Sequence, residues 1–145
     1  MTTLKPALPR WPYWAVALAS LPWNGFGAFD FTMTMIRDPD YLAQFPPEMM
    51  PVIDAFPAWT ILAWACGVWG ALAGSLLLLA RSRFAVWAFV LSLAGLAAST
   101  AYQQSIAMPA SLTTPAMQAM NAVIWAGALF LLWYAWRQRR AGVLR

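Results

Sequence analysis

The chain has 145 residues, of which 62% are hydrophobic and only 10% charged, whereas a typical soluble domain has about 25% charged residues. A soluble domain of this length has too little interior to bury so much apolar surface, so the composition predicts an integral membrane protein and excludes a disordered chain. There is no histidine and Cys66 is the only cysteine, which excludes His-ligated haem or zinc, Ser-His-Asp catalysis and an internal disulfide.

Uncharged stretches predict four membrane-spanning helices. Residues 11–36 contain a single charge and residues 55–80 contain none. Residues 84–136 are also uncharged, but Pro109 and Pro115 divide them into two helices. A bilayer core about 30 Å thick requires about 20 apolar residues in a helix. We therefore expect one transmembrane domain, an all-α antiparallel four-helix bundle with spans at about 12–36, 57–80, 84–106 and 117–136.

The charges predict the orientation of these spans. Every basic residue except Arg37 lies before the first span, between the second and third, or after the fourth, and therefore on one side of the membrane. Because basic loops face the cytoplasm, we expect both termini there. The net charge of +4 then reflects topology and attraction to anionic lipid rather than nucleic-acid binding. The residues on the basic side are Lys5, Arg10, Arg81, Arg83, Arg137, Arg139, Arg140 and Arg145.

The loop between the first two spans, residues 37–56, is the longest connection and carries most of the acidic residues. Its four prolines forbid a long helix, and its second half is rich in apolar side chains. We expect it to lie in the membrane interface as an extracytoplasmic cap over the bundle. The alternative is a loop packed on the helix ends. The acidic residues are Asp38, Asp40, Glu48 and Asp54.

Small residues form a stripe on each of the second and third predicted spans. Gly67, Gly70 and Gly74 recur in steps of three and four, which places them on one helical face. Ser92 and Gly95 belong to a similar stripe on the third span. The turn between these spans is short, so the two helices must be antiparallel neighbours. Because small residues let backbones approach closely, we expect the two stripes to face each other.

The first predicted span carries a proline and the only charge within an apolar stretch. Pro22 removes one helical hydrogen bond, and Asn24 and Asp30 follow it. A charged Asp in hydrocarbon costs at least about 2.5 kcal/mol, so it must face the bundle, pair with another group or take up a proton. Arg37, on the same helical face, is a candidate ion-pair partner. Other polar residues at similar depth are Thr60, Tyr102, Gln103, Gln104, Gln118 and Asn121.

Two interpretations of Asp30 remain open. In one, Asp30 belongs to a buried polar clamp that ties the first span to the third and fourth spans and to the outer loop. In the other, it supplies the charge of a ligand-binding site that opens to the outer side. We find no nucleophile–base pair, metal-ligand cluster or phosphate-binding loop in the sequence, so we expect neither an enzyme nor a bound metal or cofactor. The candidate ligand-binding residues are Asp30, Asn24, Trp23, Trp64 and Tyr102.

Several motifs stand out in the first two-thirds of the chain: Trp-Asn-Gly-Phe-Gly-Ala-Phe-Asp at residues 23–30, Tyr41-Leu42, Pro57-Ala58-Trp59, Gly67-Val68-Trp69-Gly70 and Gly74-Ser75. Together they resemble a group of small, uncharacterised bacterial four-helix inner-membrane proteins, some of which are labelled sugar-transporter-like. The resemblance implies a four-helix fold in the bacterial inner membrane but no mechanism. A sugar site needs several hydrogen-bonding side chains, and the predicted core is poor in them.

The sequence thus favours a non-enzymatic integral membrane protein that binds or passes a small, largely apolar molecule from the outer side. The alternative is an accessory or scaffold subunit of a larger membrane complex, or a homo-oligomer. A short bundle with small-residue faces and no evident reaction chemistry suits such docking. In either case the lipid bilayer is the principal surrounding, and no nucleic acid is expected.

Overall fold

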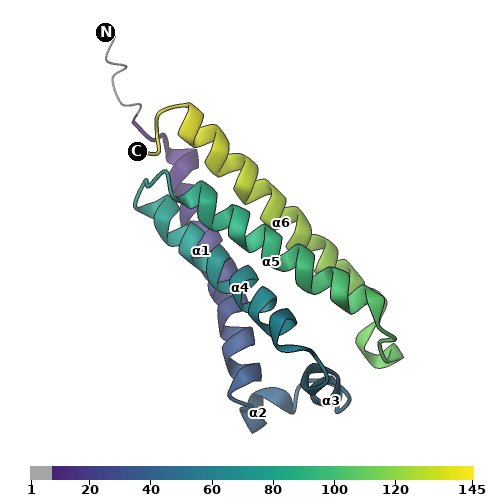
Figure 1. Ribbon diagram of the computed structural model, residues 1–145. Helices are drawn as coiled ribbons and strands as arrows, with labels where there is room; N and C mark the ends of the chain where they lie inside the picture. The colour runs from purple at the N-terminus through teal and green to yellow at the C-terminus, as the bar shows by residue number, and fades with distance from the viewer. Residues whose placement is uncertain (1–7) are drawn as a thin grey trace.

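The structure of the protein, a computed structural model, describes residues 8–145, and all its regular elements are helical (Figure 1). No strand occurs in this described range, so the expected all-α class is confirmed. The long helices are α1 (Trp11–Met35), α4 (Ala58–Leu79), α5 (Ala85–Ser105) and α6 (Pro115–Arg140), and the short elements are α2 (Pro39–Leu42), α3 (Met49–Asp54) and the 3-10 helix η1 (Ala110–Leu112).

Each predicted span coincides with one long helix. The ends of α1, α4 and α5 lie one residue from the predicted boundaries, whereas α6 begins two residues earlier and ends four residues later. The early start of α6 has a local cause, because Thr114 caps the helix by accepting a hydrogen bond from the Met117 amide at 3.3 Å and Pro115 occupies the first turn. Basic residues in its last turn favour the extension at the other end.

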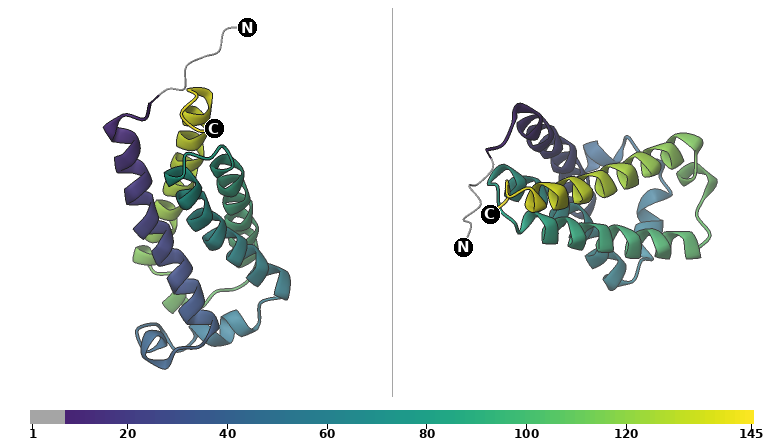
Figure 2. Two further views of the ribbon diagram at one scale, coloured as in Figure 1. Left: turned by 90° about the vertical axis from the view of Figure 1, so that its left-hand side faces the viewer. Right: turned by 90° about the horizontal axis from the view of Figure 1, so that it is seen from above.

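The four long helices form an open bundle. Central α4 packs along α5, while α1 packs on α4 and α6 packs on α5. The start of α1, the α4–α5 turn and the C-terminus lie at one end, here called the terminal end (Figures 1 and 2). The short elements α2, α3 and η1 lie at the opposite, loop end. Apart from Arg37, the described basic residues lie at the terminal end. Lys5 lies outside the described residues.

Three of the described helices are long and apolar enough to cross a membrane, namely α4, α5 and α6. α1 has 25 residues, which is sufficient in length, but it is not among them. Its composition explains the difference, because the side chains of Asn24 and Asp30 and several hydroxyl groups lower its hydropathy. The structure therefore supports membrane association through three helices.

The contact between α4 and α5 brings the two backbones close together. A Cβ added to Gly95 would overlap the Ala63 carbonyl and lie 2.6 Å from the Gly67 amide nitrogen. The Ser92 hydroxyl donates a hydrogen bond to the Gly67 carbonyl at 2.6 Å. A Cβ on Gly70 would lie 3.2 Å from the Ser92 backbone nitrogen. The two small-residue stripes therefore lie against each other, and they allow this approach because they lack bulky side chains.

Gly74 extends the same contact toward the terminal end. A Cβ at this position would lie 2.6 Å from the Phe89 ring. The ring itself is almost fully buried, with 2% of its surface exposed. Gly74 thus provides the space that admits Phe89 of α5 against α4.

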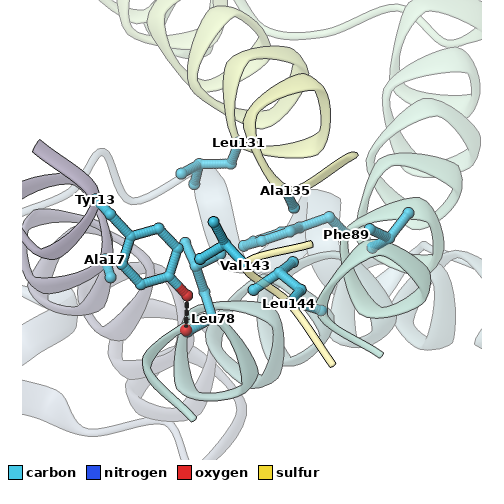
Figure 3. Packing of buried hydrophobic residues seen from close by; sticks show 10 residues of the cluster. Tyr13, Ala17, Leu78, Phe89, Leu131, Ala135, Val143 and Leu144 are labelled. Atoms are coloured by element: carbon cyan, nitrogen blue, oxygen red, sulfur yellow. Dashed lines mark hydrogen bonds between the residues drawn. The ribbon is translucent and has the colours of Figure 1, made fainter. Parts of the chain in front are cut away.

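The buried core lies at the terminal end (Figure 3). The Tyr13 hydroxyl of α1 donates a hydrogen bond to the Leu78 carbonyl of α4. The C-terminal residues fold back onto the α4–α5 turn, where the Arg145 amide donates to the Arg81 carbonyl at 2.8 Å and the Arg83 amide donates to the Arg145 carbonyl at 2.7 Å. This end is therefore closed. The core cluster comprises Tyr13, Ala17, Leu78, Ala85, Val86, Phe89, Leu131, Ala135, Val143 and Leu144.

We predict that Gly95→Ala destabilises the protein in mild detergent by about 1–3 kcal/mol, because its methyl group forces the α4 and α5 backbones apart. Gly25→Ala is the matched control, since nothing lies within 4 Å of a Cβ on that helical glycine. Thermal unfolding followed by circular dichroism measures both. Equal unfolding temperatures for the two variants would show that the α4–α5 approach is not tight.

Candidate functional site

A cleft of about 470 Å³ lies between the four long helices. The helices α1 and α6 are close at the terminal end and diverge toward the loop end (Figure 1). Trp23 of α1 still approaches α6, because a Cβ on Gly127 would lie 3.4 Å from its indole nitrogen. The walls are mostly apolar. Residues lining the cleft include Trp23, Phe26, Phe45, Trp64, Val68, Phe89, Leu96, Met120, Ile124, Ala128 and Leu131.

Asp30 lines this cleft and accepts a hydrogen bond from a residue of the loop. The Tyr41 hydroxyl donates to Asp30 Oδ1 at 2.6 Å. The chain reverses at Arg37, whose φ of 58° is left-handed, and the Asp38 amide donates back to the Met33 carbonyl at 3.1 Å. This turn carries Tyr41 back over the end of α1 and beside the carboxylate.

The local sequence fixes the position of Tyr41. Asp38 caps α2 because its Oδ1 accepts a hydrogen bond from the Tyr41 amide at 2.8 Å, and Pro39 occupies the first turn of that helix. The Tyr41 ring packs edge-on against Phe29 at 5.6 Å between centroids. Burial, and then the hydrogen bond and negative charge of Asp30, raise the pKa of the Tyr41 phenol above its usual value of 10.0. The phenol therefore remains a hydrogen-bond donor at neutral pH.

Asn24 lines the cleft but its amide group joins two helices. Its Nδ2 donates to the Ser75 hydroxyl at 2.8 Å and to the Ala71 carbonyl at 3.3 Å, both on α4. Ser75 is completely buried. Asn24 therefore fits the polar-clamp interpretation, since its donors are engaged between α1 and α4.

The two predicted tryptophans lie on the walls of the cleft. Trp64 of α4 packs edge-on against Phe31 of α1, with ring centroids 4.9 Å apart. Trp23 is 43% exposed and lies where α1 approaches α6. These rings bring aromatic surface to two sides of the cleft.

Tyr102 lies outside the cleft, contrary to expectation. Its ring packs edge-on against Phe56 and Trp59, with centroid distances of 5.4 Å in each case. Ser92, Leu96 and Ser99 of α5 line the cleft, and the next position on that face is residue 103. Tyr102 is therefore rotated toward the start of α4.

The candidate ion pair between Asp30 and Arg37 does not form. Arg37 forms an ion pair with Asp54 at 2.5 Å, and both side chains are about half exposed or more, at 60% and 47%. Arg37 itself lies in the left-handed turn that follows α1. Sequence reasoning missed Tyr41 as the partner, although Asp38-Pro39 is a helix-start signal that predicts a reversal directly after the first span.

Comparison with known protein families, with curated proteins and with solved structures gave no match for this chain. The resemblance to small bacterial four-helix inner-membrane proteins therefore stays a prediction. Within residues 8–145, no group of three His, Cys, Asp or Glu side chains is placed to hold a metal ion. The candidate site is thus defined by the geometry of the cleft alone.

We predict that the Tyr41 phenol titrates above pH 10, because its folded-state pKa is raised. Folding then favours the neutral phenol, so the stability it contributes is complete below pH 10 and is lost as pH rises through the folded-state pKa. Ultraviolet difference titration of the wild type against Tyr41→Phe isolates the phenolate absorbance of this one residue. A midpoint at or below 10 would contradict the hydrogen bond to Asp30.

Proposed function

We propose that this chain is a non-enzymatic integral membrane protein that binds or passes a small, largely apolar molecule. The cleft carries this proposal. Its volume of about 470 Å³ lies within the range of about 300–1,000 Å³ that is typical of small-molecule sites. Such sites combine apolar and aromatic walls with a few polar groups, and Asp30 and Tyr41 supply the polar groups here.

We further propose that α1 crosses the bilayer with α4, α5 and α6, as the fourth helix of an antiparallel bundle. Its Asn24 and Asp30 side chains are engaged within the protein. Its Leu18 and Phe29 are exposed to the surroundings, at 58% and 45%, as expected of a lipid-facing surface. The polar groups that reduce the hydropathy of α1 thus contact protein.

The arrangement of charges supports an orientation with both termini in the cytoplasm of a bacterial cell, across its inner membrane. Arg137 lies over the Trp133 ring at 5.5 Å and Arg140 over Trp136 at 4.8 Å, both in the last part of α6. Such aromatic and basic pairs are typical of a membrane interface. The loop end, with most of the acidic residues, would then face outward.

The loop after α1 would act as the extracytoplasmic cap of the cleft. Tyr41 and Phe45 from this loop line it. Ser111 beside α6 donates a hydrogen bond to Glu48 of the same loop at 3.3 Å. The ligand would enter near the loop end, where α1 and α6 diverge (Figure 1).

One observation favours the alternative function of an accessory or scaffold subunit. In the most apolar 18-residue stretch of α6, only 6% is buried inside the protein, whereas in the corresponding stretch of α5 the buried share is 33%. Lipid alone can cover this face, and so can a helix of a partner or of a second copy. A reproducible large complex on native gels in mild detergent would favour the subunit, and a monomer or small homo-oligomer favours the binding protein.

To test the binding proposal, we predict that Ala128→Trp weakens binding of the neutral fluorophore N-phenyl-1-naphthylamine by about tenfold or more, equivalent to about 1.4 kcal/mol. Ala128 lines the cleft from α6, so an indole there occupies ligand volume. Ala126→Trp is the matched control, because Ala126 lies on the same helix, is exposed and does not line the cleft. Equal affinities for both variants would contradict a site in the cleft.

A further inference from the structure

We propose that the cleft selects lipophilic cations, molecules that carry a permanent positive charge on an aromatic or aliphatic body, with Asp30 as the counter-charge. This inference rests on the proposed function, because it names the class of small molecule that the same cleft takes. Three features support it: the charge of the cleft, the aromatic rings that line it, and its mostly apolar walls.

The charge of the cleft is negative and unbalanced. Asp30 is the one charged side chain among the residues that line it. Arg37, the basic residue nearest in the sequence, is engaged by Asp54 instead. Within residues 8–145, Asp30 takes part in no ion pair. A carboxylate partly removed from water attracts a cation more strongly than an exposed one does, because screening is weaker.

The hydrogen bond from Tyr41 holds the carboxylate in place without neutralising it. The phenol donates to Oδ1, and burial, followed by the hydrogen bond and charge of Asp30, raises the pKa of that phenol, so it stays a neutral donor at neutral pH. A neutral donor lowers the cost of the charge but does not replace a cation. The pair therefore remains complementary to a positively charged ligand.

Aromatic rings surround the same space. Tyr41 packs against Phe45 with centroids 5.3 Å apart, and both line the cleft. Trp23 and Trp64 line it from α1 and α4. Faces of Trp and Tyr rings attract cations, most strongly where water is excluded. A cation beside Asp30 would therefore gain from the carboxylate and from the adjacent Tyr41 ring, while the other rings would contact its apolar body.

The composition of the walls disfavours the other ligand classes. A neutral apolar molecule would fill the cleft but leave the Asp30 charge without a counter-ion. An anion would meet a like charge at short range. A strongly hydrated inorganic cation would lose its water against mostly apolar walls. A cation on an apolar body matches both the charge and the walls.

The test compares two probes of nearly the same size and shape and opposite charge, tetraphenylphosphonium and tetraphenylborate. Equilibrium dialysis measures their binding to the purified full chain in nonionic detergent, with protein-free micelles as the blank. We expect the wild type to bind the phosphonium at least about tenfold more tightly than the borate. This comparison needs no variant and is independent of folding defects.

Asp30→Asn then assigns the preference to one residue, because the amide keeps an acceptor for Tyr41 but removes the charge. We expect a loss of about tenfold or more in phosphonium affinity and unchanged binding of neutral N-phenyl-1-naphthylamine. Asp40→Asn is the matched control, since it removes the same charge from an exposed position outside the cleft and should leave phosphonium binding unaltered.

The possible failures are distinguishable. Neutral-probe binding without a preference for the phosphonium overturns this inference and leaves the proposed function standing. Absence of binding by every probe overturns both. If Asp30→Asn weakens the neutral probe and the phosphonium equally, Asp30 maintains the fold of the cleft and is not its counter-charge, which also overturns the inference.

Discussion

The proposed position of α1 in the membrane depends on one constraint: a polar side chain of a helix that crosses lipid is costly unless it finds a partner inside the protein. α1 meets this constraint along its length. Three of its hydroxyl groups bond to carbonyls of the same helix, and Asn24 and Asp30 bond to other elements. Within α1, the Ser20 hydroxyl donates to the Ala17 carbonyl at 2.9 Å, that of Thr32 to the Ala28 carbonyl at 2.7 Å, and that of Thr34 to the Asp30 carbonyl at 2.8 Å.

The cleft follows from the unequal packing of the two ends of the bundle. The close α4–α5 contact through Gly67 and Gly95 makes a narrow central pair, so α1 and α6 each find a partner on a different helix of that pair. The core cluster joins all four helices at the terminal end. Toward the loop end, α1 and α6 diverge (Figure 1), and the space between them is lined by aromatic rings of α1 and by aliphatic side chains of α6.

The sequence predicted the long helices well because uncharged length, prolines and turn residues act locally. It also indicated the Gly67 and Ser92 stripes, since their spacing follows helical geometry. Contacts between elements were harder to predict. Tyr41 reaches Asp30 only through the left-handed turn at Arg37, and Tyr102 lies outside the cleft because of the rotation of α5. Such rotations depend on tertiary packing, which helical periodicity does not specify.

The most direct test of the central claim, that α1 crosses the membrane with its polar side chains turned into the protein, is the side of the membrane on which each end of α1 lies. Single cysteines at Arg10, Asp40 and Arg83, introduced with Cys66 replaced by serine, can be labelled in intact cells with a membrane-impermeant maleimide. All three native positions are exposed. The account predicts labelling at position 40 only; labelling at both 10 and 40, or at neither, would contradict it.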